Sequence, residues 1–289
     1  MAKYRVPVSS KPERIGKRQV LLVANGDLRL AANRQCWPAQ QAMEEALAKA
    51  LSAAGHEVVR AHPYDAEKGH GFIDSQHYGI KVFASIDPKA KLIVAEAVWQ
   101  YSHHILGGLL AHRGPILTVA NWSGTWPGLV GMLNLNGSLT KAGREYSTLW
   151  SEDFTDEWFL KNLRRWLEKE KIKHPTPHVT PLKKVKLPAA ERKLGESLAE
   201  QLRRQPVIMG IFDEGCMGMY NAIIPDELLF PLGVYKERLS QSALYYETMQ
   251  VRDDEALAVR HWMEQRGTKF VTGPNEETDL TDNQILLQC

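Results

Sequence analysis

The sequence has 289 residues, of which 44% are hydrophobic and 24% charged, a composition typical of globular proteins with one large or two ordinary domains. Its formal net charge of +2 argues against a dedicated nucleic-acid surface. The apolar runs are too short to cross a bilayer, and the N-terminus lacks the apolar core of a signal peptide. The three cysteines, Cys36, Cys216 and Cys289, are too few and too scattered for a disulfide framework or a four-ligand zinc site. We therefore expect a cytoplasmic protein that binds neither nucleic acid nor membrane.

The first part of the chain alternates strand and helix patterns, with residues 25–38 between them predicted as a turn and a polar loop. The predicted strands are residues 19–24, 56–61, 80–84, 91–98 and 115–120. The predicted helices are residues 39–54, a stretch after residue 98, a segment beginning near residue 130, and residues 155–171. Gly55 is predicted to end the first helix as a left-handed cap. The alternation predicts an α/β fold, with a Rossmann-like parallel sheet in an N-terminal domain over residues 1–171.

The second part of the chain begins with a proline- and lysine-rich stretch, residues 172–188, which is typical of an extended interdomain linker. A second α/β domain is predicted over residues 189–289. Its predicted helices are residues 191–204, 240–249 and 254–266, and its predicted strands are residues 206–212 and 269–271. Because two strands cannot form a stable covered sheet alone, this second domain is expected to be incomplete.

The last residues contain a helix start signal. Thr281 and Gln284 match a capping box, and Ile285-Leu286-Leu287 begins an apolar face. A helix of about two turns is marginal by itself. The pattern predicts a truncated chain, with a short docked C-terminal helix as the alternative.

Candidate ligand-binding residues follow the predicted strands of the first domain, because ligands of open parallel sheets bind beyond the carboxyl ends of the strands. These segments read N-G-D-L-R-L-A-A-N-R, W-Q-Y-S-H-H and N-W-S-G-T-W-P-G. The candidate residues are Asp27, Arg29, Arg34, Trp99, His103, Asn121, Trp122 and Trp126. Indole faces pack on sugar C–H groups, while arginines and carboxylates orient hydroxyls, so the set suits a neutral polyol. Any single tryptophan fits core packing better than ligand contact; the polyol hypothesis depends on the set.

Two histidine-containing segments are weaker candidates. A metal site is conceivable at His62, Asp65, His70, Asp74 and His77. Their spacing follows neither a helical face nor a zinc pattern, which disfavours it. His103 and His104 point to different faces of any helix, so they do not form a chelating pair.

The stretch from Pro206 to Tyr235 contains an acidic pair at a predicted strand end, Asp213 and Glu214. These residues fit either a cap for the next helix or a contact to substrate or to a metal ligand. Cys216 has no neighbouring base in the sequence, so it fits a small buried hydrophobic residue best.

The run F-D-E-G-C-M-G-M-Y-N-A-I-I-P-D-E-L-L, continued by G-V-Y-K-E-R-L-S-Q-S-A-L, resembles the second-domain segment of the L-fucose isomerase family, including its L-fucose/L-arabinose isomerase-like members. The strand-end segments with Arg29, Arg34 and Trp99 are similar to the family's first domain. The resemblance covers nearly the whole chain and is most specific over residues 212–244. It implies two N-terminal α/β domains followed by a C-terminal domain in a cytoplasmic enzyme that is usually a hexamer.

The resemblance also implies an activity, the manganese-dependent interconversion of an aldose and a ketose through an ene-diol. A divalent cation stabilises the developing charge on the substrate oxygens, and carboxylates act as acid and base. The family's metal-binding residues come from segments expected beyond Cys289, so no catalytic or metal-binding residue is expected in this chain. For this chain, the resemblance implies a substrate wall, meaning a surface that contacts the sugar, formed by Arg29 or Arg34 together with Trp99. In the family's hexamer this surface closes over the active site of a neighbouring subunit. The chain alone is expected to be inactive; the alternative is a non-catalytic sugar-binding or regulatory α/β module.

Overall fold

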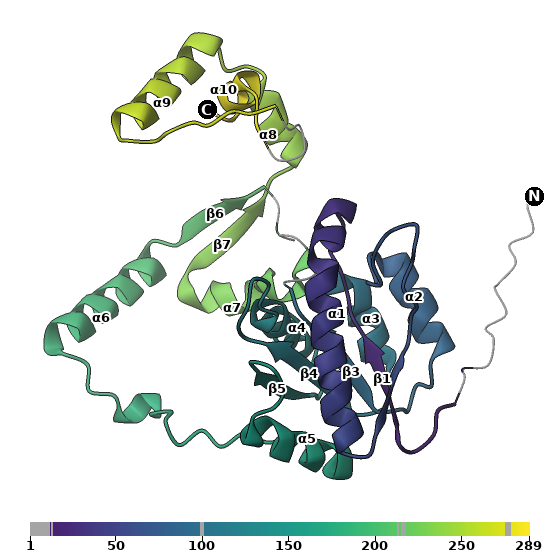
Figure 1. Ribbon diagram of the computed structural model, residues 1–289. Coiled ribbons are helices and arrows are strands. Elements are labelled where there is room, and N and C mark those ends of the chain that lie inside the picture. The colour runs from purple at the N-terminus through teal and green to yellow at the C-terminus, as the bar shows by residue number, and fades with distance from the viewer. Residues whose placement is uncertain (1–11, 13, 99–100, 213, 215–217, 275–278) are drawn as a thin grey trace, which may run out of the picture. The chain divides into compact units, whose positions relative to one another are not determined.

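The computed structural model describes residues 12, 14–98, 101–212, 214, 218–274 and 279–289. The chain divides into two compact units (Figure 1). The first unit comprises Met1–Lys186 and Gly215–Ile224, and the second comprises Leu187–Glu214 and Pro225–Cys289. Part of the first unit therefore comes from a segment that is distant in the sequence.

A parallel sheet forms the centre of the first unit. Its strands are β1 (Gln19–Val23), β2 (Glu57–Arg60), β3 (Leu92–Glu96), β4 (Ile116–Asn121) and β5 (Ser147–Ser151). They lie in the order β2-β1-β3-β4-β5, and every pairing is parallel. The predicted α/β class with a Rossmann-like sheet is thus confirmed. The strand order reverses between β1 and β3, which makes their carboxyl ends the point where such folds bind ligands.

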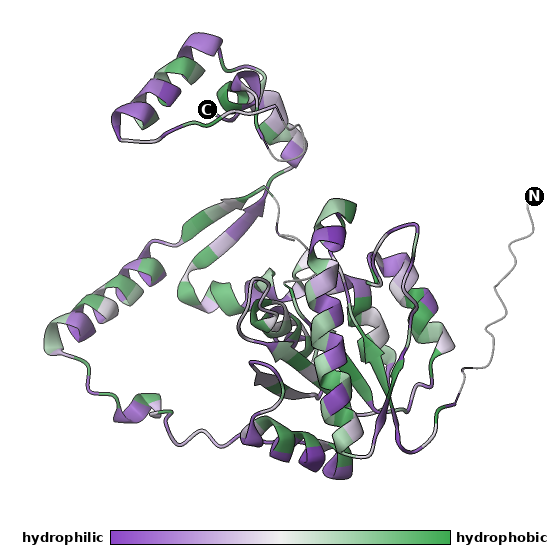
Figure 2. Cartoon of the chain, viewed as in Figure 1, coloured by the Kyte–Doolittle hydropathy of each residue, from purple (hydrophilic) through white to green (hydrophobic). Residues whose placement is uncertain are grey.

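Helices cover both faces of this sheet. One face packs against α1 (Leu30–Ala53) and α5 (Glu157–Lys169), and the other against α2 (Gln76–Ser85), α3 (His103–Ala111) and α4 (Leu129–Lys141). Successive strand side chains point to opposite faces, so Leu22 joins the α1 side and Leu21 the α2 side. The central strands β1, β3 and β4 are therefore mostly apolar (Figure 2), because both faces of the sheet are covered.

Two predictions for the first unit were wrong, and one of its strands was not predicted. Helix α1 begins at Leu30 and continues through Pro38, so most of the predicted polar loop is helical. Residues 80–84, predicted as a strand, lie in α2, where the Ser75 side chain accepts a hydrogen bond from the Tyr78 N–H as the N-cap. Strand β5 was not predicted, since S-T-L-W-S alternates in burial and contains little apolar sequence.

The second unit contains mostly helices and a small sheet. Its helices are α6 (Ala189–Arg204), α7 (Asp226–Leu229), α8 (Gln241–Thr248), α9 (Asp253–Gln265) and α10 (Asp282–Gln288). Strands β6 (Val207–Ile211) and β7 (Val234–Arg238) pair in parallel. Strand β7 was not predicted. The strand predicted at residues 269–271 was wrong, because only an isolated bridge joins Thr272 to Leu280 there.

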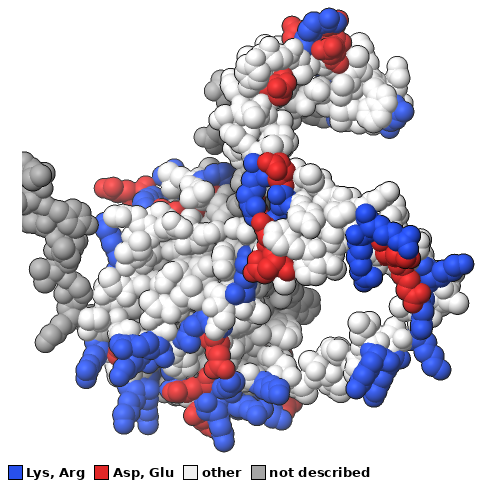
Figure 3. Space-filling view, turned by 180° about the vertical axis from the view of Figure 1, so that it is seen from behind, with Lys and Arg blue, Asp and Glu red and all other residues white. Residues whose placement is uncertain are grey.

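The described residues also contain short elements. They include the 3-10 turns η1 (Leu182–Lys184), η3 (Tyr220–Ala222) and η4 (Phe230–Leu232). The capping box that starts α10 is confirmed, with the Thr281 hydroxyl accepting from the Gln284 N–H at 3.2 Å. Within the described residues, no helix is long and apolar enough to cross a membrane. In the view of Figure 3, acidic side chains interrupt the basic ones, so no continuous basic surface forms there.

Candidate functional site

The carboxyl ends of β1 and β3 share a small apolar cluster. Ala24, Cys36, Phe72 and Val98 form it, and Trp126, from the loop after β4, packs against it. This loop therefore lies beside the chain that leaves β1 and β3. The structure brings together segments that were predicted separately from the strand ends.

Asp27 and Arg29 form an ion pair just beyond β1. The guanidinium donates from Nε to Oδ1 of Asp27 at 3.0 Å and from Nη2 to Oδ2 at 2.7 Å. Burial raises the pKa of Asp27, but the hydrogen bonds from Arg29 outweigh this effect and hold the pKa below its usual value. Asn33 fixes the turn, because its Oδ1 accepts from the Asp27 N–H and its Nδ2 donates to the Asp27 carbonyl. The Arg29 side chain is nevertheless 63% exposed, so a held guanidinium faces solvent.

Arg34 has a different environment. Its Nε donates to the Lys68 carbonyl at 2.8 Å and its Nη2 to the Glu67 carbonyl at 3.1 Å. These bonds attach α1 to the loop after β2. Arg29 is therefore the better placed of the two predicted arginines for ligand contact, while Trp99 lies outside the described residues.

The two adjacent histidines are both engaged by the protein. Nδ1 of His103 lies against the Gly218 carbonyl. His104 is buried and stacks on Tyr101 with ring centroids 5.5 Å apart. Burial lowers the pKa of His104, and its Nδ1 lies 3.2 Å from the Ile73 carbonyl, which requires an N–H there. Only Nδ1 of His103, which was predicted as a substrate contact, is engaged in this way.

Asn121 shapes the loop after β4. Its Nδ2 donates to the Ser123 carbonyl at 2.8 Å, and its Oδ1 accepts from the Gly128 N–H at 3.1 Å. A Cβ at Gly128 would lie 1.7 Å from the Glu96 carbonyl oxygen, so this approach of α4 to β3 requires glycine. Trp122 is half-exposed.

A groove of about 510 Å³ lies between α1 and the chain that follows β4 and β5. We call it the α1 groove. Residues that line it include Gln35, Ala39, Ala42, Thr125, Trp126 and Glu152. Asn121 and Asp153 also line it. The sequence predicted Asn121 and Trp126 but missed the two carboxylates, because they follow the unpredicted strand β5.

Glu96, the last residue of β3, is a further polar residue that sequence reasoning missed. Its side chain is buried, and within the described residues neither carboxyl oxygen has a hydrogen-bond partner. Burial raises the pKa of Glu96 well above its usual value. The carboxyl group is therefore neutral over a wider pH range than an exposed one. A glutamate at the end of the apolar run L-I-V-A-E was the available signal.

Most residues of the weak metal candidate after β2 make structural contacts. His62 Nε2 accepts from the Ala24 N–H at 3.1 Å, and burial, followed by the Arg60 charge, lowers its pKa well below the usual value. Lys68 Nζ donates to Asp74 at 2.7 Å. Across the part of the chain that the structure describes, no group of three or more His, Cys, Asp and Glu side chains is placed to hold a metal ion.

The acidic pair of the second unit is described only at Glu214, since Asp213 and Cys216 lie outside the described residues. Glu214 accepts from Lys236 and, at 2.9 Å, from Arg238, and both bases also contact Asp226. Hydrogen bonds from Arg238 and then Lys236 lower the pKa of Asp226 to about 2. Glu214 is therefore part of an ion-pair cluster, while the start of the segment that it was predicted to cap lies outside the described residues.

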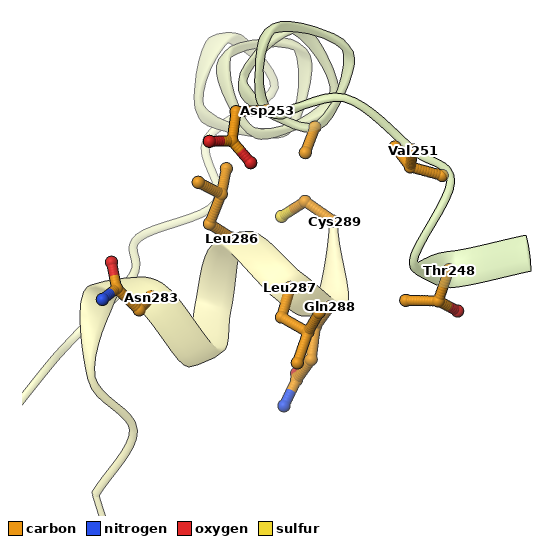
Figure 4. Close-up of a pocket in the computed structure, with 9 residues that line it drawn as sticks. Thr248, Val251, Asp253, Asn283, Leu286, Leu287, Gln288 and Cys289 are labelled. Atoms are coloured by element: carbon orange, nitrogen blue, oxygen red, sulfur yellow. The ribbon is translucent and has the colours of Figure 1, made fainter. Parts of the chain in front are cut away.

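The second unit also contains a cavity of about 430 Å³ among α8, α9 and α10 (Figure 4). Its lining includes Asp253, Asn283 and Leu286, with Cys289 at the end of α10. It contains one carboxylate and no aromatic side chain. It therefore fits a polyol less well than the α1 groove does.

Comparison with known proteins adds no assignment. No protein-family model matches the sequence, and no curated protein shows significant similarity to it.

Proposed function

We propose that this chain is the N-terminal part of a metal-dependent aldose–ketose isomerase that acts on L-fucose, L-arabinose or a related sugar. Within that enzyme it supplies a sugar-binding wall. The resemblance of residues 212–244 supports the reaction class. The proposed setting is a cytoplasmic homo-oligomer, a hexamer by resemblance, which binds neither nucleic acid nor membrane.

The observation that carries the proposal is the ion pair of Asp27 and Arg29 beyond β1. A guanidinium held by a carboxylate presents its donors in one plane, and sugar hydroxyls are distinguished by hydrogen bonds with fixed directions. The pair lies beside the point where the strand order reverses, where ligands of this architecture bind.

The proposed reaction moves a proton between C1 and C2 of the sugar. A bound Mn²⁺ supplies stabilisation of the charge that develops on the two oxygens. The described residues contain no cluster of ligands for such an ion. The role proposed for this chain is therefore to bind and orient the sugar, and the metal ligands belong to other parts of the enzyme.

The test is a ligand-observed NMR titration of the purified chain with L-fucose and L-arabinose. Replacing Arg29→Ala should weaken binding about ten-fold, because a charged hydrogen-bond donor is lost. Arg34→Ala is the matched control and should have little effect. Circular dichroism of both variants shows whether the fold persists. If the wild-type chain binds neither L-fucose nor L-arabinose, the proposal is wrong.

A second assay concerns catalysis. Residues 1–289 with added Mn²⁺ should not interconvert L-fucose and its ketose. Measurable isomerisation by this chain would contradict the assignment of the metal centre to other segments.

A further inference from the structure

The α1 groove contains polar groups that the proposed sugar wall does not use. Its carboxylates follow β5, a strand that the sequence pattern did not reveal. Arg29 does not line it. The groove is therefore a separate feature of the same edge of the sheet.

Small apolar side chains from α1 line one side of the groove, which we call its floor. Ala39, Ala42 and Ala46 come from one face of α1, where residues three and four apart are neighbours. Trp126 adds an indole beside this floor. The volume of the α1 groove, about 510 Å³, lies within the range of roughly 300–1,000 Å³ found for small-molecule sites. Small methyl groups beside an indole suit the C–H face of a sugar ring.

The rim of the groove offers hydrogen-bonding groups. Gln35, Thr125 and Glu152 are exposed, and none of their side chains makes a hydrogen bond or ion pair with another described residue. Asp153 differs, because its Oδ1 accepts from the Thr155 N–H at 3.0 Å and from the Thr155 hydroxyl at 2.7 Å. Glu152 is thus the carboxylate with capacity for a ligand hydroxyl.

The charge of the groove restricts the ligand. Its lining contains the carboxylates of Glu152 and Asp153 and no lysine or arginine. A phosphorylated sugar would meet two like charges and no cation. A neutral sugar would meet one amide, one hydroxyl and one carboxylate on the rim.

We propose that the α1 groove is a subsite for a neutral sugar and that Glu152 determines its specificity against phosphorylated sugars. This inference rests on the proposed sugar-binding function and extends it. Glu152 accepts hydrogen bonds from sugar hydroxyls, while Trp126 and the alanines of α1 contact the C–H face.

The experiment is an NMR titration of the full chain with L-fucose and with L-fucose 1-phosphate. The wild-type chain should bind L-fucose at least about ten-fold more tightly than the phosphate, a difference on the scale of one charged hydrogen bond. Glu152→Gln should weaken L-fucose binding about ten-fold. It should also reduce the difference in affinity between L-fucose and L-fucose 1-phosphate. Glu168→Gln, which removes an exposed carboxylate on α5, is the matched control. It should change neither the affinity for L-fucose nor the affinity for L-fucose 1-phosphate.

The outcomes separate this inference from the function on which it rests. If Arg29→Ala weakens sugar binding while Glu152→Gln and Thr125→Ala leave it unchanged, the α1 groove is not a sugar subsite. The proposed function then still stands. Equal affinity of the wild-type chain for L-fucose and its 1-phosphate overturns the role of Glu152. A wild-type chain that binds no sugar overturns both.

Discussion

Glu96 gives the first unit an unusual dependence of stability on pH. Its pKa is raised by burial, so the folded chain keeps a proton that the unfolded chain releases above its usual pKa of 4.5. Between these two pKa values the folded state binds more protons than the unfolded state. This contribution to the free energy of unfolding is therefore fully present below pH 4.5 and falls as the pH rises.

Replacing Glu96→Gln should remove this pH dependence. The variant should therefore become more stable relative to the wild type from pH 4 to pH 8, seen as an increase in its free energy of unfolding minus that of the wild type. Denaturant unfolding across this range measures the difference, with Glu168→Gln as the exposed control. A constant difference between variant and wild type contradicts the assignment.

Glycine residues in two settings should respond oppositely to alanine. Gly128→Ala places a Cβ against the Glu96 carbonyl oxygen and should cost about 2 kcal/mol or more of stability. Gly107, in α3, has open space around the equivalent position, so Gly107→Ala should stabilise by about 0.5–1 kcal/mol. Thermal and denaturant unfolding measure the stability of both variants relative to the wild type. A loss of stability at both positions contradicts the geometry.

At the scale of elements, the segment Gly218–Ile224 docks on α3 and α4 within the first unit. Lys141 Nζ donates to the Tyr220 carbonyl at 2.9 Å and to the Ile223 carbonyl, and it lies 4.3 Å from the centroid of the Tyr220 ring. Ser138 donates to Asn221 at 3.3 Å. A single cation thus fixes two backbone carbonyls and one aromatic ring.

Lys141→Met should release this segment. Loss of hydrogen bonds from a charged donor should raise amide exchange over residues 218–224 at least about ten-fold, while β3 and β4 keep their protection. Hydrogen–deuterium exchange with mass spectrometry measures both, and Lys161→Met is the control on α5. Unchanged exchange over residues 218–224 would show that Lys141 does not hold the segment.

Elements with strong apolar patterns were predictable from the sequence, and elements set by tertiary contacts were not. The alternation of L-L-V-A and L-I-V-A-E runs with helices was enough for the class of fold. The first part of α1 was not predicted because it contains Pro38. A proline inside a helix is unfavourable on local grounds, and the surrounding structure compensates for it. Strand β5 was not predicted because only alternate residues of it are buried. Since Glu152 follows β5, it was not identified as a candidate either.

The same distinction applies to the candidate site. Asn121 and Trp126 were predictable because they follow an apolar strand. The choice between Arg29 and Arg34 was not, since it depends on which guanidinium meets the loop carbonyls of residues 67 and 68. No sequence pattern encodes that contact.

For the whole molecule, the two units differ in their burial of apolar surface. Among the described residues of the second unit, Ala256 and Ile285 are the only buried hydrophobic side chains. Strand β6 is exposed along most of its length, although its sequence is apolar. Parallel sheets are normally covered on both faces, so the second unit lacks the burial that stabilises this architecture.

The second unit should therefore open at much lower denaturant concentration than the first. Amides of β6 and β7 should exchange faster than those of β3 and β4, and a hydrophobic dye should bind the native chain. Hydrogen–deuterium exchange and dye fluorescence test this on the full chain. Equal protection of the two sheets contradicts it.

The discontinuity of the first unit has a consequence for synthesis on the ribosome. The sheet and its helices are complete in the nascent chain by residue 169, but the segment that satisfies Lys141 is made later, at residues 218–224. Until that segment emerges, α3 and α4 present their docking residues to the surroundings. The first unit can thus reach its final form only after the first part of the second unit, Leu187–Glu214, has been translated, so the two units are not completed one after the other along the chain.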